Sequence, residues 1–190
     1  MHGYYLTPSY KSEEPGKAEG LDTSTIILGD GPTSRLYRQL VETKNVAANA
    51  GASFSAVGLD SRTLTVYAIA GGGVKPQGLE QAIDVAIAQF IKEGPNEEEL
   101  ELAKNAMIAS YVYSADNQAG LAQRYGSNLV IGRTIADMEE WPDRVAKVTA
   151  ADVKKVAAKY LVLETSVTGF LIPQSAADEG TDKMRGEVRQ

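Results

Sequence analysis

The 190-residue sequence contains no cysteine, and its single histidine, His2, lies next to the N-terminus. Without cysteine the chain has no disulfide and no thiolate metal site. A lone imidazole with no carboxylate cluster beside it in the sequence does not supply the three protein ligands of a usual catalytic zinc site. We therefore predict that this chain binds no metal.

Long apolar runs and clusters of positive charge are also missing. No apolar run approaches the roughly 20 residues that a helix needs to cross a bilayer, so we predict no membrane span. The 19 basic and 25 acidic residues give a net charge of -6, which argues against nucleic acid as a partner. The motifs His-x-x-Glu-His, Gly-x-Ser-x-Gly and the phosphate loop are absent.

The composition that remains is that of one ordinary globular domain. Hydrophobic residues make up 43% of the chain and charged residues 23%, which is enough apolar chain for a sizeable core. We expect this domain to occupy residues 1–173. Residues 174–190 are polar and unpatterned, which is typical of a disordered tail.

Strand patterns are concentrated in the first 70 residues. The β-prone residues 3–10 predict a first strand, broken near Pro8. Residues 46–53 and 62–69 show period-two alternation and are joined by a short Gly-Leu-Asp-Ser segment, so we predict an antiparallel hairpin. Two helices, at residues 18–28 and 34–43, precede this hairpin, and a Gly-Asp-Gly-Pro turn separates them.

The rest of the chain is mainly helical in pattern. A helix begins at Pro76, and capping boxes at Asn96/Glu99 and Thr149/Asp152 predict the starts of two more. Further helices are predicted from about residue 116 to 131 and from Thr134 onward. Because a last strand follows at residues 166–172, we predict an α+β sandwich in which helices lie on one face of a mostly antiparallel sheet.

Two groups of chemically active side chains have ordinary explanations. The glutamates at residues 97–99 and 101 occupy a first helical turn, where the helix dipole favours acids, so we interpret them as capping residues rather than an ion site. Tyr111, Tyr113 and Tyr125 are interpreted as core and rim aromatics rather than general acids.

Four segments share their order and spacing with one known family: GDGPTSRLYRQLVETK, GPNEEELELAKNAMIASYVYSADNQAGLAQRYG, VTAADVKKVAAKYL and SVTGFLIP. Over residues 4–173 the chain resembles the C-terminal, non-zinc half of bacterial pitrilysin/insulinase-family zinc peptidases. The resemblance implies two similar halves that enclose a peptide substrate. It also implies that the zinc motif lies in a missing N-terminal half or a partner chain, so we predict that this chain alone hydrolyses no peptide.

The same resemblance identifies substrate-facing positions. In the family, an arginine on the short helix and a tyrosine seven residues later commonly reach the substrate, and here these positions are Val41 and Ala48. Neither side chain donates a hydrogen bond. Arg38 precedes Val41 by three residues on the same helix face, so Arg38 or the nearby Arg35 is the candidate replacement. The alternative is that both arginines are ordinary surface or packing residues.

The absent arginine and tyrosine leave a second function open. The alternative to the non-catalytic half of a peptidase is a structural homologue in a larger assembly, like the core subunits of respiratory complexes that share this fold. A zinc motif encoded roughly 200 residues upstream, or in a neighbouring frame, would favour the peptidase. The resemblance implies a bacterial protein, and the sequence does not distinguish a periplasmic from a cytoplasmic location.

Overall fold

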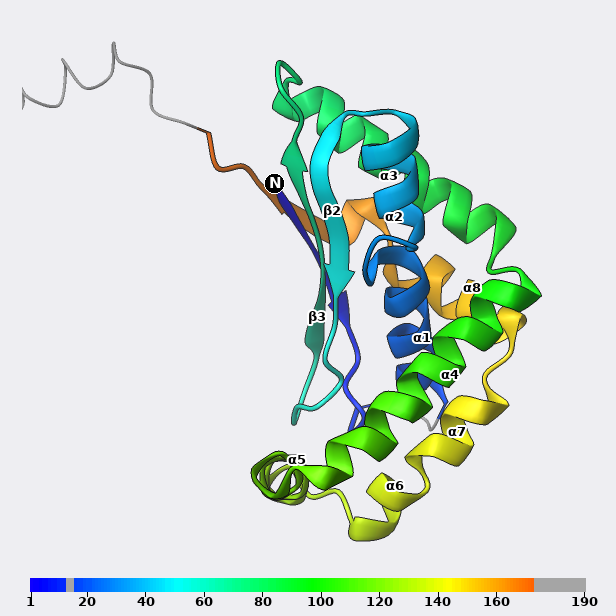
Figure 1. Ribbon diagram of the computed structural model, residues 1–190. Coiled ribbons are helices and arrows are strands. Elements are labelled where there is room, and N and C mark those ends of the chain that lie inside the picture. Colours follow the sequence, from blue (N-terminus) through cyan, green and yellow to red (C-terminus); the bar gives the residue numbers. More distant parts are fainter. Residues whose placement is uncertain (13–15, 173–190) are drawn as a thin grey trace, which may run out of the picture.

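A computed structural model describes residues 1–12 and 16–172. In them four antiparallel strands form one sheet in the order β2–β3–β1–β4, and the helices cover one of its faces (Figure 1). The predicted α+β sandwich is confirmed, and the predicted tail lies outside the described residues. The strands are β1 (His2–Thr7), β2 (Ala47–Ser53), β3 (Arg62–Ala70) and β4 (Ser166–Gly169).

Most helices begin and end close to the predicted residues. In the first predicted capping box, Asn96 Oδ1 accepts from the Glu99 N–H at 2.8 Å, and Glu99 Oε2 accepts from the Asn96 N–H at 2.9 Å. Thr149 and Asp152 form the second. The helices are α1 (Lys17–Gly29), α2 (Arg35–Tyr37), η1 (Arg38–Thr43), α3 (Pro76–Glu93), α4 (Glu97–Tyr113), η2 (Ser114–Asp116), α5 (Gln118–Val130), α6 (Ile135–Glu139), α7 (Trp141–Lys147), α8 (Ala150–Tyr160) and η3 (Leu163–Thr165).

The predicted hairpin is confirmed, since β2 pairs antiparallel with β3 along its length. Successive side chains of β3 point to opposite faces of the sheet. Leu64, Val66 and Ala68 therefore lie in the core beneath the helices, while Ile69 on the opposite face is 59% exposed. A register shift between Ala47 and Asn49 leaves Ala48 exposed at the start of β2.

One predicted strand breaks where expected, and another is shorter than expected. β1 ends at Thr7, which confirms the predicted break near Pro8, because Pro8 has no N–H for a strand ladder. β4 ends at Gly169 rather than at residue 172, because Gly169 pairs with His2, the first residue of its only partner strand. Residues 170–172 have no described strand beside them to continue the ladder.

Two predicted helices differ in form. The helix at 34–43 begins as a short α-helix but continues as the π-helix η1, in which Lys44 N–H donates to Gln39 O at 2.9 Å, five residues back. The helix predicted from Thr134 through Trp141 is divided into α6 and α7. Pro142 lies in the first turn of α7, where a residue without an N–H is tolerated, and it cannot continue α6.

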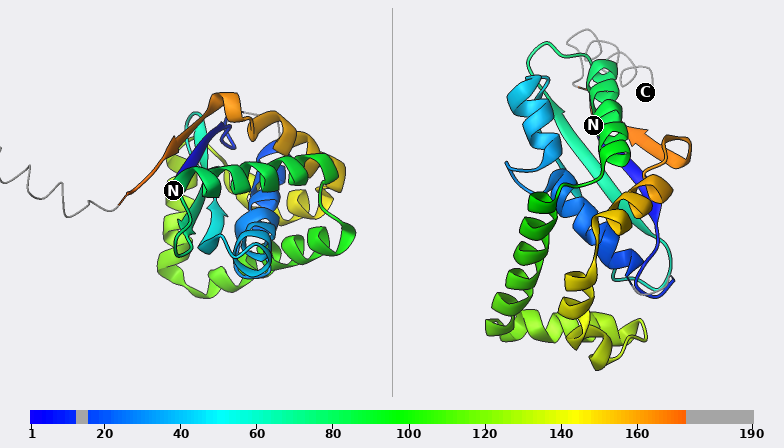
Figure 2. Two further views of the ribbon diagram at one scale, coloured as in Figure 1. Left: turned by 90° about the horizontal axis from the view of Figure 1, so that it is seen from above. Right: turned by 90° about the vertical axis from the view of Figure 1, so that its right-hand side faces the viewer.

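The core lies between the sheet and helices α1, α3 and α8. Leu21 and Leu28 of α1, Phe90 of α3 and Val153 of α8 are fully or almost fully buried. Helices α5, α6 and α7, with the C-terminal part of α4, project past the turn of the β2–β3 hairpin (Figures 1 and 2). We call this part, residues 107–147, the distal lobe.

Candidate functional site

Arg35, the first predicted substrate-facing residue, is used for packing. Its Nε and Nη2 donate to the two carboxylate oxygens of Glu99 at 2.8 and 2.7 Å, and Nη2 also donates to Gly94 O at 2.8 Å. The guanidinium lies 5.3 Å from the centroid of the Phe90 ring. Arg35 therefore connects α2 to the junction of α3 and α4 and has little freedom to reach a ligand.

Arg38 is placed differently. It is exposed on η1, and within residues 1–12 and 16–172 no hydrogen bond or ion pair holds its guanidinium. Val41, three residues on, is half-buried and packs against the core, and Ala48 is exposed at the start of β2. Arg38 is thus the one of the four predicted residues that offers an exposed charge; this charge acts on Glu99 at the start of α4, and η1, which carries it, packs against the edge strand β2.

A cavity of about 440 Å³ lies between α1 and the distal lobe. Its floor contains buried Thr25, Met107 and Met138, whereas Ala106 and Ser110 are exposed at its mouth. Aromatic side chains dominate the wall: Tyr10, Phe54, Tyr111 and Trp141. The sequence analysis gave no indication of this cavity, because its lining comes from helices that are far apart in the chain.

Asp22 is one of two acidic groups that line this cavity, together with Asp30. Tyr10 Oη donates to Asp22 Oδ2, and Trp141 Nε1 donates to Tyr10 Oη at 2.7 Å. Burial raises the pKa of Asp22 to about 7, and the charge of Glu19 adds to this, against the opposing effects of the Tyr10 bond and of Arg133. Burial also raises the pKa of Tyr10 well above its usual value. Asp22 is the functional candidate that the sequence analysis missed, since an isolated aspartate in a helix carries no sequence signal.

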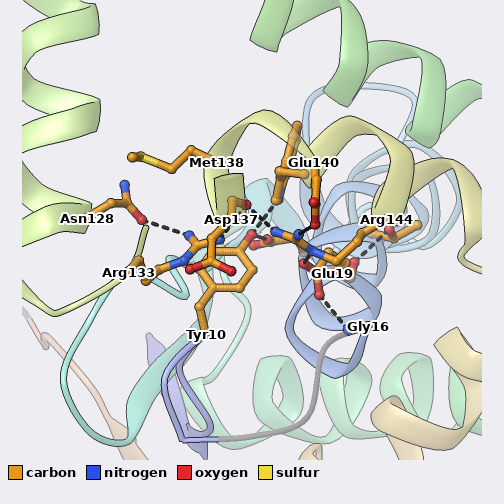
Figure 3. A network of polar contacts seen from close by, with 12 residues as sticks. Tyr10, Gly16, Glu19, Asn128, Arg133, Asp137, Met138, Glu140 and Arg144 are labelled. Carbon is orange, nitrogen blue, oxygen red and sulfur yellow. Dashed lines mark hydrogen bonds and ion pairs between the residues drawn. The ribbon is translucent and has the colours of Figure 1, made fainter. Parts of the chain in front are cut away.

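Behind this wall a buried ion pair connects α1 to the distal lobe (Figure 3). Glu19 is 1% exposed, and its Oε1 accepts from Arg144 Nε at 2.7 Å while its Oε2 accepts from the Gly16 N–H at 2.8 Å. Arg144 also donates to Asp137 O. The charge of Glu19 is therefore compensated inside the protein rather than by solvent.

Arg133 extends the same network along the cavity. It donates to Asn128 Oδ1 at 2.7 Å and to Asp137 O at 3.0 Å, and its guanidinium stacks 4.2 Å from the centroid of the Tyr10 ring (Figure 3). These contacts fix Tyr10, and with it the hydrogen bond to Asp22. The network gives the cavity a rigid wall.

Comparison with known proteins identifies the family. Residues 4–107 match the model of the peptidase M16 inactive domain. The chain belongs to this family. It is 27% identical over 173 residues to the zinc protease PqqE of Helicobacter pylori, a match that covers 89% of this chain and 37% of that protein.

Solved structures have the same fold. The inactive peptidase domain of a candidate zinc protease from Bordetella parapertussis matches with a TM-score of 0.80 and 22% identity, over 92% of each chain. A protease from Helicobacter pylori matches with a TM-score of 0.77 and 19% identity, over 87% of this chain and 38% of that one. The predicted resemblance is confirmed: the chain is an M16 inactive domain, the non-catalytic half of zinc protease-like proteins.

The side chains of this inactive domain do not suit zinc. In the part of the chain that the structure describes, no three His, Cys, Asp or Glu residues come together as a metal site. His2 lies between aromatic rings, 6.1 Å from the Tyr4 centroid and 6.2 Å from that of Tyr67. None of the described helices combines the length and apolar character that crossing a bilayer requires.

Replacing Asp22 with asparagine should remove a pH-dependent component of stability. The pKa of Asp22 is about 7 in the folded protein, against an ordinary value of 3.8, so its contribution to stability is complete below about pH 4 and is lost as the pH rises to 7. The slope is at most about 1.4 kcal/mol per pH unit. We expect urea unfolding at pH 4.5, 6 and 8 to show wild type losing stability relative to Asp22→Asn across this range.

The exposed Asp116 provides the control, since Asp116→Asn changes a surface residue and should alter stability by less than about 0.5 kcal/mol. A difference between wild type and Asp22→Asn that does not change with pH would contradict the assigned pKa.

Proposed function

We propose that this chain forms the non-catalytic wall of a peptide-binding chamber in a two-half zinc peptidase. Zinc and the groups that act with it belong, in this proposal, to a companion half in the same precursor or a separate subunit. Two findings support a companion half: the chain belongs to the family of M16 inactive domains, and it spans 37% of the length of its Helicobacter pylori relative. The relatives named above are described as proteases, and none is described as part of a respiratory assembly.

The observation that carries the proposal is the placement of Arg38. Its exposed guanidinium is carried by η1, which packs against β2 at the edge of the sheet. An extended peptide beside an edge strand presents carbonyl groups to such a cation, and a guanidinium in a partly dehydrated chamber stabilises negative charge on an oxygen. Arg38 thereby replaces the donors that Val41 and Ala48 lack, and Arg35 holds the helix in place.

Removal of the Arg38 charge should slow the complete two-half enzyme. We expect Arg38→Ala to lower kcat/KM for a quenched-fluorescent peptide by about tenfold or more, which corresponds to about 1.4 kcal/mol of transition-state stabilisation. Lys44→Ala is the matched control, because Lys44 is also an exposed cation and directly follows η1. Equal kinetics for both variants and wild type would show that Arg38 does not contact the substrate.

A further inference from the structure

We propose that the cavity between α1 and the distal lobe is a subsite that accepts one large apolar side chain of the peptide. This inference rests on the proposed function and names the part of the substrate that this half selects. It follows from three observations: the apolar lining of the cavity, the partners of its charged side chains, and the position of the cavity relative to β2.

The lining favours an apolar occupant. Side chains of Ile26, Met107 and Met138 form the apolar surface between the aromatic rings, with Phe54 and Val57 contributed by the β2–β3 connection. At about 440 Å³ the cavity has the size of pockets that bind small ligands. Apolar surface of this kind gains free energy mainly by excluding water, so an aromatic or branched aliphatic side chain suits it.

Most donors of the two cations in the wall are already engaged, which argues against an acidic occupant. The Arg124 guanidinium lies 4.2 Å from the centroid of the Tyr111 ring, and its Nη1 donates to Ser114 Oγ at 2.8 Å, whereas its buried Nε has no partner among the described residues. Arg133 is held by Tyr10 and by its hydrogen bonds to the distal lobe. Both guanidinium groups therefore stack on aromatic rings and form part of the wall, and one Arg124 N–H remains for a polar atom of the occupant.

The position of the cavity agrees with a peptide that also contacts Arg38. Phe54 directly follows β2, whereas Ala48 and η1 are at its opposite end. Ala48 and Phe54 are six residue steps apart along the chain, which amounts to roughly 20 Å in an extended strand. One extended peptide of about seven residues therefore reaches both places.

Asp22 makes occupancy depend on pH. An apolar side chain excludes water from the cavity and favours the neutral carboxyl of Asp22. The charged and titratable groups around Asp22 are Tyr10 from the segment after β1, Glu19 on α1 and Arg133 before α6. Asp30 and Arg124 line the same cavity. Binding is therefore accompanied by proton uptake at Asp22, and it tightens as the pH falls toward about 7 and levels off below that value, where Asp22 is already protonated in the free protein.

The chain contains a natural reporter, because Trp141 is its only tryptophan and lines the cavity. The probe is an acetylated and amidated heptapeptide of glycine, serine and alanine with one central phenylalanine, added to the full chain while Trp141 fluorescence is followed. We expect saturable binding that is at least tenfold weaker when alanine replaces the phenylalanine. Equal affinity for the two peptides would overturn the proposal.

Two neighbouring positions on α4 provide the matched variants. Ala106 is exposed at the mouth of the cavity, and Ala109 is exposed on the same helix outside it. We expect Ala106→Phe to weaken binding of the phenylalanine peptide at least tenfold and Ala109→Phe to change it less than twofold, with unchanged circular dichroism for both. If both variants bind like wild type, the cavity is not the subsite.

The pH dependence gives an independent readout. Wild type should bind the phenylalanine peptide more tightly at pH 6 than at pH 8, and Asp22→Asn should bind equally at both. No pH effect in wild type would overturn the link between binding and protonation of Asp22.

Failure of the proposed subsite and failure of the proposed chamber are distinguishable in the complete enzyme. If Arg38→Ala slows turnover while Ala106→Phe leaves it unchanged, the proposed chamber is supported and the proposed subsite is wrong.

Discussion

Arg144→Met should lower the free energy of unfolding by about 3–5 kcal/mol. The substitution keeps much of the side-chain volume but leaves Glu19 as an uncompensated charge that is 1% exposed, after removing a partner at 2.7 Å. It also removes the hydrogen bond to Asp137 O that connects α7 to α6. Since small domains have net stabilities of about 5–15 kcal/mol, urea unfolding will show this loss as a large fall in the midpoint.

Two controls distinguish the stability cost of a buried, uncompensated charge from the cost of losing one contact. Adding Glu19→Gln to Arg144→Met should recover part of the loss, because the neutral amide still accepts from the Gly16 N–H. Glu101→Gln breaks the pair with Lys104 at its 57% exposed end and should cost less than about 1 kcal/mol. An Arg144→Met protein as stable as the Glu101→Gln protein would refute the buried ion pair.

Gly29→Ala should destabilise the fold more than the same substitution at any other described glycine. A Cβ at Gly29 would lie 1.9 Å from Ala52 N and 2.6 Å from Gly51 C, so the end of α1 and strand β2 touch backbone to backbone. No rotamer change relieves a contact with backbone, and either the helix or the strand must move. We expect a loss of about 3 kcal/mol or more in urea unfolding, at the upper end for overpacking.

Gly126→Ala is the matched comparison for Gly29→Ala. Gly126 lies inside α5, and a Cβ there meets nothing within 4 Å. The same added methyl group should stabilise the protein by roughly 0.5–1 kcal/mol, because alanine loses less backbone entropy than glycine in a helix. If both variants shift the unfolding midpoint by similar amounts in the same direction, the close approach of α1 and β2 is wrong.

The features that could be predicted from sequence are those that depend on neighbouring residues. The β2–β3 hairpin follows from period-two alternation across a short connection, and the capping boxes follow from side chains three residues apart. The division of one predicted helix at Pro142 also follows from a local signal, because proline begins a helix more readily than it continues one. Local chemistry thus accounts for most of the fold.

The candidate site depends instead on distant residues. Arg35 and Arg38 are equivalent in a sequence reading, and what distinguishes them is Glu99, 64 residues beyond Arg35. Trp141 and Tyr10 are 131 residues apart, yet their hydrogen bond positions the partner of Asp22. No local pattern records such contacts, so neither the raised pKa of Asp22 nor the cavity could be predicted from this sequence alone.

Peptide hydrolysis by the reassembled protein tests the central claim most directly. Turnover of a quenched-fluorescent peptide is measured with this chain alone, with the zinc-binding half alone and with the two combined, each with added zinc. The account predicts no hydrolysis by this chain, little by the zinc-binding half, and turnover that rises until one equivalent of this chain has been added. Chelator-sensitive hydrolysis by this chain alone, or full turnover by the zinc-binding half without it, would contradict the account.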